Sequence, residues 1–313
     1  MDFLPAVFFA MGSISLLLVF SCRTREPPQS SFNLLSATAV TGQLVVAVQA
    51  LGSFRQLAIE WQEPVKSILE LTKFLTLDLQ VLRLTCLYGA DRPVLNFISN
   101  LLVCPAICAS VICSWFLARL CGKRKPWDAA FNLCGLLLFA FFLSITLSTI
   151  TPFQCAPNPN GSSSMATNPG IICYESDEHV HLVGLAVAGI IFEPAAILAW
   201  ATYAVVMYPT RVASGRSLRL VNRHRFLFHR FKSESYYYSV VLLYRSGLIA
   251  LLPVILIDAP AFQVPLMGSL LLVSLALQSR TYPWRTMTAN HVDLVLTIIL
   301  LWILLGAAPL LRL

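Results

Sequence analysis

The sequence predicts an all-α integral membrane protein, built as a polytopic transmembrane helical bundle of about eight spans with the N-terminus outside. Hydrophobic residues make up 57% of the 313 residues and charged residues only 12%, whereas a soluble domain is usually about 25% charged. The apolar residues come in blocks of about twenty, the length that crosses roughly 30 Å of hydrocarbon. The basic residues lie in connectors between these blocks, which indicates an anionic lipid surface as partner and not a nucleic acid.

Each apolar block must form a helix, because the bilayer core holds no water to satisfy free backbone groups. The expected spans are residues 3–20, 32–51, 95–117, 129–150, 182–207, 240–257, 262–277 and 291–310. The first block has a signal peptide as its alternative. Its start carries Asp2 in place of a basic residue, and Arg23 and Arg25 follow the apolar run without an A-x-A site, so we expect a retained helix.

The charge distribution predicts the orientation of a single transmembrane domain over residues 1–313. With the N-terminus outside, four basic connectors that hold about 15 of the 22 Lys and Arg all lie in the cytoplasm, as the positive-inside rule requires. Within this domain we expect an outer amphipathic segment at 54–94, an outer disulfide loop at 151–180 and a basic cytoplasmic loop at 208–236.

The outer segment at 54–94 carries an apolar stripe at helical spacing. Its members are Ile68, Leu71, Leu75, Leu79 and Leu82. One apolar stripe on an otherwise charged helix indicates a surface helix. It would lie along the outer membrane interface or pack, as part of a small cap, on the end of the bundle.

The outer loop at 151–180 contains Cys155 and Cys173, with the sequon Asn160-Gly161-Ser162 between them. Two cysteines in one short loop on the oxidising side of a membrane predict a disulfide. A glycan at Asn160 would belong on the same side. The alternative is two free thiols and an unused sequon, and Cys86 is a further cysteine outside that could compete.

Two charged residues fall well inside expected spans, away from the span ends. Glu193 lies near the middle of the fifth span, beside Pro194, and such a carboxylate usually faces a partner or a water-filled path. Arg245 lies in the sixth span at a depth within roughly one helical turn of Glu193. The two residues are therefore candidates for an ion path or a buried pair. Their alternatives are a protonated, hydrogen-bonded Glu193 and an Arg245 that extends to the headgroups.

Other polar groups have simpler interpretations. Asp258 and the Asn290…Asp293 pair sit at span ends, where we expect caps or turns. The basic cytoplasmic loop is explained by topology alone or, more sharply, by binding of anionic inner-leaflet lipids such as phosphoinositides. Its lipid-contacting candidates are Arg211, Arg216, Arg219, Arg223, Arg225, Arg230 and Lys232.

The chain shows none of the sequence patterns that mark common catalytic or phosphate-binding sites. The cysteines are scattered without CxxC pairs, so we expect no zinc or other metal. We therefore expect no enzymatic activity and no cofactor. The expected partners are membrane lipids and a second copy of the chain.

Four stretches resemble a family of polytopic membrane regions at the C-termini of large protist and algal proteins, which often follow cysteine-rich ephrin-receptor-like repeats. They are Phe153-Gln154-Cys155 with Ile172 to His179, Trp61 to Pro64 with Leu84-Thr85-Cys86, Phe226-Leu227-Phe228 with Tyr236 to Tyr238 and Tyr244-Arg245, and Tyr282-Pro283-Trp284 with Asn290 to Asp293. The resemblance covers about residues 30–310, but its motifs are loose aromatic, Pro and Cys spacings. This chain lacks the large ectodomain, so the resemblance does not imply the sensing role that such a domain would carry. A fragment of a longer gene product would show the same sequence features.

That family is distantly similar to fungal transient-receptor-potential-like membrane proteins. The resemblance implies a multi-pass protein of the plasma membrane or an endomembrane that passes or gates cations, with Glu193 in the path. The competing hypothesis is a non-conducting anchor, scaffold or receptor module, whose polar residues hold the helices together. A water-filled path past Glu193 would favour conduction, and a packed Glu193–Arg245 pair would favour the scaffold.

Overall fold

The computed structural model describes residues 32–57, 59, 61–63, 65–72, 93–120, 122, 126–159, 161–214, 221–257 and 259–307. Within these residues, six helices are long and apolar enough to cross a membrane, or seven if one bent pair counts as a single span. The chain is therefore a mainly α-helical, multi-pass integral membrane protein. The expected span at 3–20 lies outside the described residues, so the total of eight stays a prediction.

The spans follow the predicted apolar blocks, with ends shifted by a few residues. The helices are α2 (Phe32–Ser53), α3 (Val65–Leu71), α5 (Pro93–Leu120), α6 (Trp127–Ala140), α7 (Phe142–Ile150), α8 (Asp177–Ile190), α9 (Ala196–Ala213), α11 (Arg225–Phe228), α12 (Tyr238–Ile255), α13 (Pro260–Thr281) and α14 (Met287–Ala307). Short 3₁₀ turns, Phe54–Gln56, Thr151–Phe153 and Ser233–Ser235, extend α2 and α7 and precede α12.

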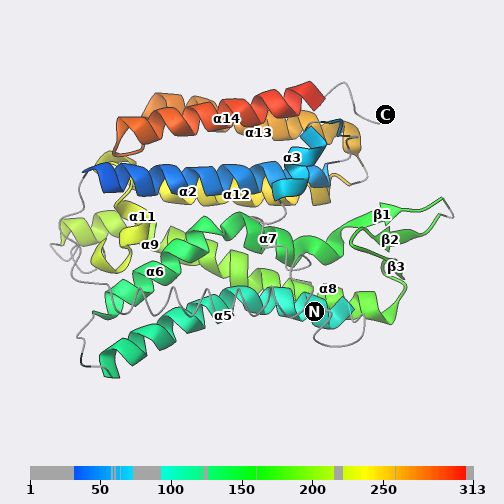
Figure 1. The fold of residues 1–313 in the computed structure, drawn as a ribbon, viewed down its shortest axis with the longest axis horizontal. Coiled ribbons are helices and arrows are strands. Elements are labelled where there is room, and N and C mark those ends of the chain that lie inside the picture. Colours follow the sequence, from blue (N-terminus) through cyan, green and yellow to red (C-terminus); the bar gives the residue numbers. More distant parts are fainter. Residues whose placement is uncertain are drawn as a thin grey trace.

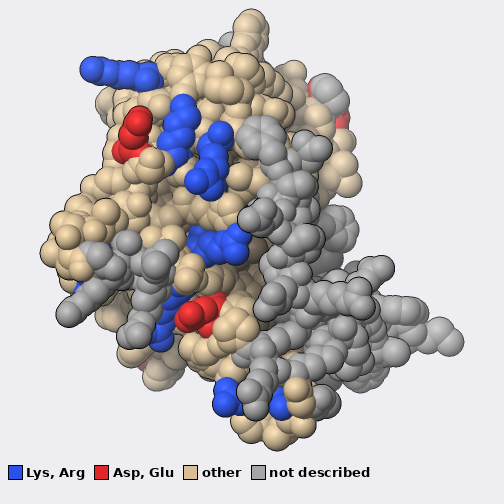
Figure 2. Space-filling view, turned by 90° about the vertical axis from the view of Figure 1, so that its left-hand side faces the viewer, with Lys and Arg blue, Asp and Glu red and all other residues tan. Residues whose placement is uncertain are grey.

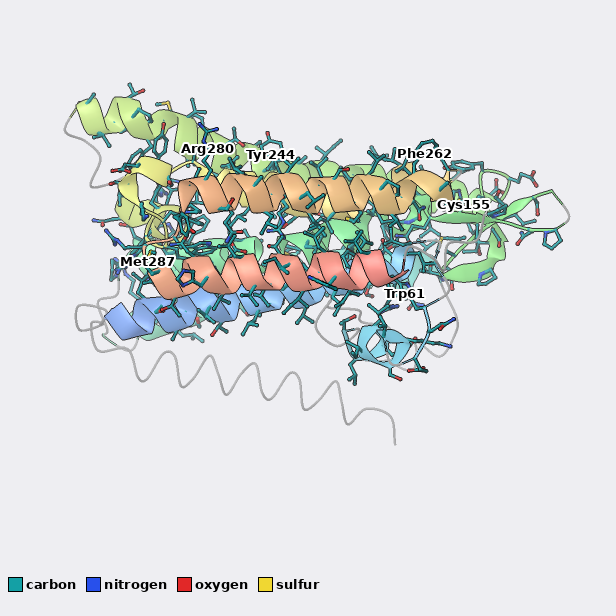
Figure 3. All side chains as sticks on the ribbon, turned by 90° about the horizontal axis from the view of Figure 1, so that it is seen from above. Trp61, Cys155, Tyr244, Phe262, Arg280 and Met287 are labelled. Carbon is teal, nitrogen blue, oxygen red and sulfur yellow. A yellow bond between two sulfur atoms is a disulfide. The ribbon has the colours of Figure 1, made fainter. Side chains whose placement is uncertain are left out.

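The long helices run side by side along one axis (Figure 1). The α14 helix packs between α13 and α2, and α12 packs against α7, α9, α13 and α2. Seen from above, Arg280 and Met287 lie at one end of the bundle, with Phe262, Cys155 and Trp61 at the other (Figure 3). Of the six single spans, α12 is the most buried (44% of its apolar window) and α5 the least (17%). The core therefore surrounds α12, and α5 lies at the margin.

Two spans depart from a regular helix. The expected span at 129–150 is broken at Phe141, where α6 and α7 meet at 59°, because Phe141 leaves the helical backbone region (φ −103°, ψ 11°). The second departure lies at Pro194, beside Glu193. Residues Ile191–Ala195 make a π-helical turn, η5, and the helix continues from Asp177 to Ala213. Proline has no N–H to donate, and a local π-helical adjustment is one way in which a transmembrane helix satisfies the freed backbone groups.

One end of the bundle, here called the sheet end, carries the 151–180 loop. This loop adds a three-stranded antiparallel sheet to the all-α prediction, in the order β1 (Cys155–Pro157), β2 (Ser163–Met165) and β3 (Asn168–Ile172). The α3 helix lies at the same end (Figure 1). Its Leu69 is buried in the main apolar core, whereas Ile68 and Leu71 of the expected stripe are exposed. The rest of that stripe lies outside the described residues.

The opposite end, here called the basic end, gathers Lys and Arg side chains. Figure 2 looks onto this end and shows several basic side chains with few acidic ones among them. Arg119, Arg211 and Arg280 lie in the last turns of α5, α9 and α13, and all three of these helices end there. The charge asymmetry that the sequence predicts between the two ends is therefore present in the fold.

Candidate functional site

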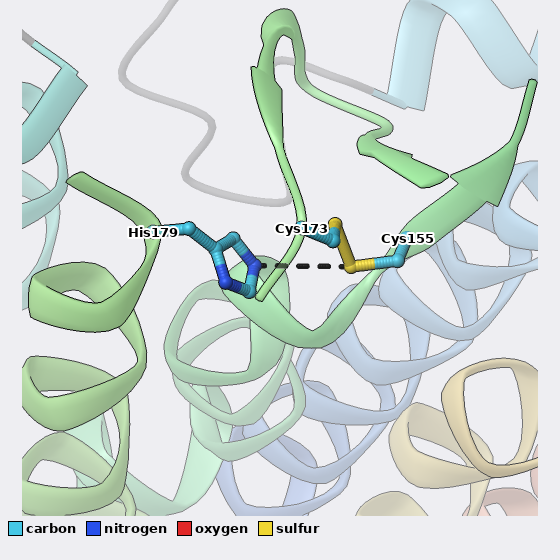
Figure 4. Close-up of side chains that lie close together, drawn as sticks. All are labelled: Cys155, Cys173 and His179. Carbon is cyan, nitrogen blue, oxygen red and sulfur yellow. Dashed lines mark hydrogen bonds between the residues drawn. A yellow bond between two sulfur atoms is a disulfide. The ribbon is translucent and has the colours of Figure 1, made fainter. Parts of the chain in front are cut away.

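The first candidate site is the disulfide loop at the sheet end. Cys155 of β1 and Cys173, just after β3, form a disulfide (Figure 4). The fully buried ring of His179 lies beside it, with Nε2 3.8 Å from the Cys155 Sγ. The Tyr174 backbone N–H donates to His179 Nδ1 (3.1 Å), so the ring proton sits on Nε2 and is donated to the Pro152 carbonyl (3.0 Å). Through these two hydrogen bonds, His179 at the start of α8 holds together the two ends of the loop, at Pro152 and at Tyr174.

This loop also has the closest grouping of potential metal ligands in the described part of the chain, Cys155, Cys173 and His179. The two sulfurs are bonded to each other, so neither is a thiolate that could bind an ion. The arrangement is that of a structural staple. Asn160, the expected glycan site, lies outside the described residues. Its neighbours Asn158 and Ser162 close the turn between β1 and β2 through an N–H···O bond of 2.8 Å.

Breaking the disulfide should loosen the loop. We expect the Cys155→Ser/Cys173→Ser double variant to lose about 3 kcal/mol of stability, the loop-entropy estimate for a loop of this size. Non-reducing peptide mapping of the native protein should recover the two cysteines linked. A peptide that joins Cys86 to either one would contradict the pairing.

Glu193, the first residue of the expected ion path or buried pair, lies in the π-helical turn η5 and is half-buried. Within the described residues its carboxylate has no hydrogen bond and no ion pair. Ile191 and Phe192, just before it, are exposed on the flank of the bundle, Phe192 to 79%. Glu193 itself lies near Cys108 of α5, at the edge of this lateral face and not at the centre of the bundle.

Arg245, the second charged residue, does not meet Glu193. It lies on α12 and lines a cavity between α2, α12 and α14, where its guanidinium donates to Thr297 Oγ1 of α14 (3.3 Å). Asp293, one helical turn before Thr297, lines the same cavity and is 7% exposed. The expected Glu193–Arg245 pair is thus not formed, because Arg245 projects towards α14 while Glu193 lies on the outer flank of the α8–α9 helix.

Asp293 is held in place by a rigid turn between α13 and α14. Its Oδ2 accepts from the Trp284 indole N–H (2.8 Å). Asn290, fully buried, accepts from the Trp284 backbone N–H (3.0 Å) and donates to the Trp284 and Thr286 carbonyls (3.0 and 3.1 Å). The expected turn role therefore applies to Asn290. The prediction that Asp293 forms a cap or turn is wrong, because Asp293 lies inside α14 as a buried acid.

The cavity contains further polar groups whose atoms lack partners. Gln43 of α2, 6% exposed, donates to the Ala289 carbonyl (2.9 Å), but its Oε1 has no hydrogen-bond partner. The Nε of Arg245 also has none. Arg230, from the segment between α11 and α12, lines the cavity near Gly42, where an added Cβ would lie 3.0 Å from its guanidinium. Burial lowers the pKa of Arg230, yet a guanidinium stays charged in proteins.

The basic loop at 208–236 does not form one flat surface in the part that the structure describes. Arg223 lies over the Phe131 ring (5.0 Å to its centre), Arg225 is exposed, and Arg230 enters the cavity. The Lys232 backbone donates to Pro283 (2.9 Å), which ties the loop to the α13–α14 turn. Arg211 ends α9. Arg216 and Arg219 lie outside the described residues.

Sequence reasoning missed Asp293 as a site residue, although a signal for it was present. Arg245 lies seven residues after the start of α12 and Asp293 six after the start of α14, and both helices begin at the basic end. At 1.5 Å per residue the two side chains are at nearly the same depth, about 10 Å into their helices. Matching depths from that end would have favoured Asp293 over Glu193 as the group near Arg245.

Comparisons of the chain with protein-family models, with curated proteins and with solved structures found no match. Any functional conclusion therefore depends on the residues and their geometry.

Proposed function

We propose that this chain is a multi-pass membrane protein that passes or gates cations, with Glu193 as the polar group in the path. The proposal rests on one observation. Glu193 has a half-buried carboxylate inside a span, and this carboxylate has no hydrogen-bond or ion-pair partner among the described residues. A carboxylate at that depth is costly unless it faces a partner or water. Its π-helical turn is a further indication, because such turns occur frequently at functional sites.

The position of Glu193 on a lateral face determines where the path would form. Exposed Ile191 and Phe192 flank it, so the single chain does not enclose the carboxylate. The proposal therefore includes a second copy of the chain, or several, packed on this face so that the Glu193 carboxylates share one water-filled path.

Current recording from purified protein in planar bilayers tests the proposal. We expect a cation current that falls severalfold in Glu193→Gln, because the substitution removes the charge but keeps the shape and hydrogen-bonding capacity. The yield of folded protein should not change. Glu178→Gln is the matched control, since Glu178 is an exposed acid in the first turn of the same helix. A silent wild-type protein, or equal currents in wild type and Glu193→Gln, would contradict conduction through this residue.

We also propose the complete topology: eight spans, the N-terminus outside, the basic end in the cytoplasm and Asn160 on the outer side. The gathering of basic residues at one end supports it, by the positive-inside rule. A membrane-impermeant thiol reagent should label Ser214→Cys only after cells are permeabilised, and Glu178→Cys in intact cells. Labelling of Ser214→Cys from outside would reverse the orientation.

A non-conducting receptor module is the second candidate, favoured by the cavity between α2, α12 and α14. Arg245 and Asp293 sit there in a cavity of about 50 Å³, within the bundle and away from Glu193. A mainly apolar cavity that holds these few charged groups within the bundle suits ligand binding better than ion passage. A protein that carries no current but binds a ligand in this cavity would support the receptor.

A further inference from the structure

The cavity between α2, α12 and α14 has an excess of positive charge. Arg245 and Arg230 contribute two guanidinium groups and Asp293 one carboxylate. No ion pair joins these three groups among the described residues, and the Asp293 carboxylate accepts instead from Trp284. Uncompensated charge away from water is expensive. The cavity is therefore one negative charge short of neutrality.

The unpartnered atoms of the cavity define what would fill it. The Nε–H of Arg245 needs an acceptor and the Oε1 of Gln43 needs a donor. The guanidinium of Arg230 has no hydrogen-bond acceptor among the described residues. A ligand that satisfies all three must carry one negative charge, several oxygen acceptors and at least one O–H. Water would satisfy the hydrogen bonds but would leave the excess positive charge of the cavity uncompensated.

We infer that this cavity binds a phosphate group that carries hydroxyls, either free phosphate or the polyol phosphate headgroup of an inner-leaflet lipid. The two guanidinium groups would hold the phosphate oxygens, which suits their planar, forked donors. The Gln43 Oε1 would accept from a hydroxyl. The inference does not depend on conduction through Glu193, which lies on another face of the bundle.

The size and position of the cavity fit the phosphate group itself, and the rest of a lipid headgroup would extend beyond it. Its volume of about 50 Å³ gives room for about four water molecules, and one tetrahedral oxyanion is no larger than such a cluster. Arg230 is half-buried at the basic end, next to α11, while Arg245 lies about two turns inside α12. Arg230 therefore lies at the outer part of the site, and Arg245 lies deeper within it.

The test uses the full chain in lipid nanodiscs and measures its thermal unfolding. In phosphatidylcholine discs titrated with inorganic phosphate, a rise in Tm that saturates identifies free phosphate as the ligand. A rise seen only in discs that contain phosphatidylinositol identifies the lipid headgroup. Arg230→Gln should weaken the binding of either ligand at least about tenfold, because it removes one charge-assisted hydrogen bond. Arg280→Gln, an exposed arginine in the last turn of α13 at the same end of the bundle, should leave it unchanged.

Two further comparisons keep the test decisive. Arg230→Lys keeps the charge, so it should fold even if Arg230→Gln does not, and it should bind with intermediate affinity because it loses the forked geometry. Sulfate, a dianion without a hydroxyl, should raise Tm less than phosphate. The inference is overturned if neither ligand raises Tm, if sulfate matches phosphate, or if Arg280→Gln and Arg230→Gln lose the effect equally. A rise that persists in Arg230→Gln, as general salt stabilisation would, overturns it too.

Discussion

Replacing Asp293 with asparagine should destabilise the folded protein by about 3 kcal/mol. A hydrogen bond to a charged group contributes about 1.5–3 kcal/mol, and Asp293 accepts one from the Trp284 indole N–H. Removal of a buried counter-charge costs about 3–5 kcal/mol when the two groups touch. Arg245 lies in the same cavity without direct contact with Asp293, so we place the loss near the lower end of that range.

A double-mutant cycle separates the charge effect from simple disruption. If Asp293 compensates Arg245, then Arg245→Gln in the Asp293→Asn background should restore part of the stability, because no buried cation is left uncompensated. Denaturant-titrated unfolding in mixed micelles measures all four proteins of the cycle. Glu193→Gln serves as a comparison and should not couple to Arg245. Additive losses in the Asp293–Arg245 cycle would show that the two charges act independently.

The second large effect is expected for Asn290→Ala, at about 2–4 kcal/mol. The substitution leaves the Trp284 backbone N–H and carbonyl without the partners that the Asn290 side chain provides (3.0 Å each). Each buried polar group left unsatisfied costs about 1–3 kcal/mol. The Thr286 carbonyl keeps the Asn290 backbone N–H as a partner (3.3 Å), so it adds little.

The same unfolding measurement tests this prediction. Asn222→Ala is a suitable control, because Asn222 is exposed and lies in the basic loop. Since the Asn290 turn also positions Asp293 through Trp284, the loss should exceed that of the control by at least about 2 kcal/mol. Equal stability of the two variants would mean that the α13–α14 turn forms without its central side chain.

The positions of the helices could be predicted closely, but their internal irregularities could not. The blocks at 32–51, 95–117, 240–257 and 262–277 correspond to α2, α5, α12 and α13. The break at Phe141 has no proline to mark it, since it depends on how α6 and α7 pack. Pro194 did mark an irregularity, yet only the structure shows a π-helical turn in a continuous helix.

The candidate sites, too, were predictable from the sequence only in part. The Cys155–Cys173 disulfide was predictable, because two cysteines in one short loop have few other partners. The three-stranded sheet that joins them was not, since it uses a Pro- and Gly-containing segment with a weak strand pattern. His179 was visible only as part of a family resemblance, and its hydrogen bonds to Pro152 and Tyr174 depend on the folded loop.

The sequence by itself determined which segments cross the membrane and which connectors are basic, because the bilayer imposes a local rule: about twenty apolar residues must pass as a hydrogen-bonded helix. Only the tertiary structure decided which charged groups meet. Depth along a helix follows from counting residues, whereas the direction in which a side chain projects depends on which helices pack against its own. Arg245 therefore faces Thr297 and the Asp293 cavity on α14, and Glu193 is left on a separate face.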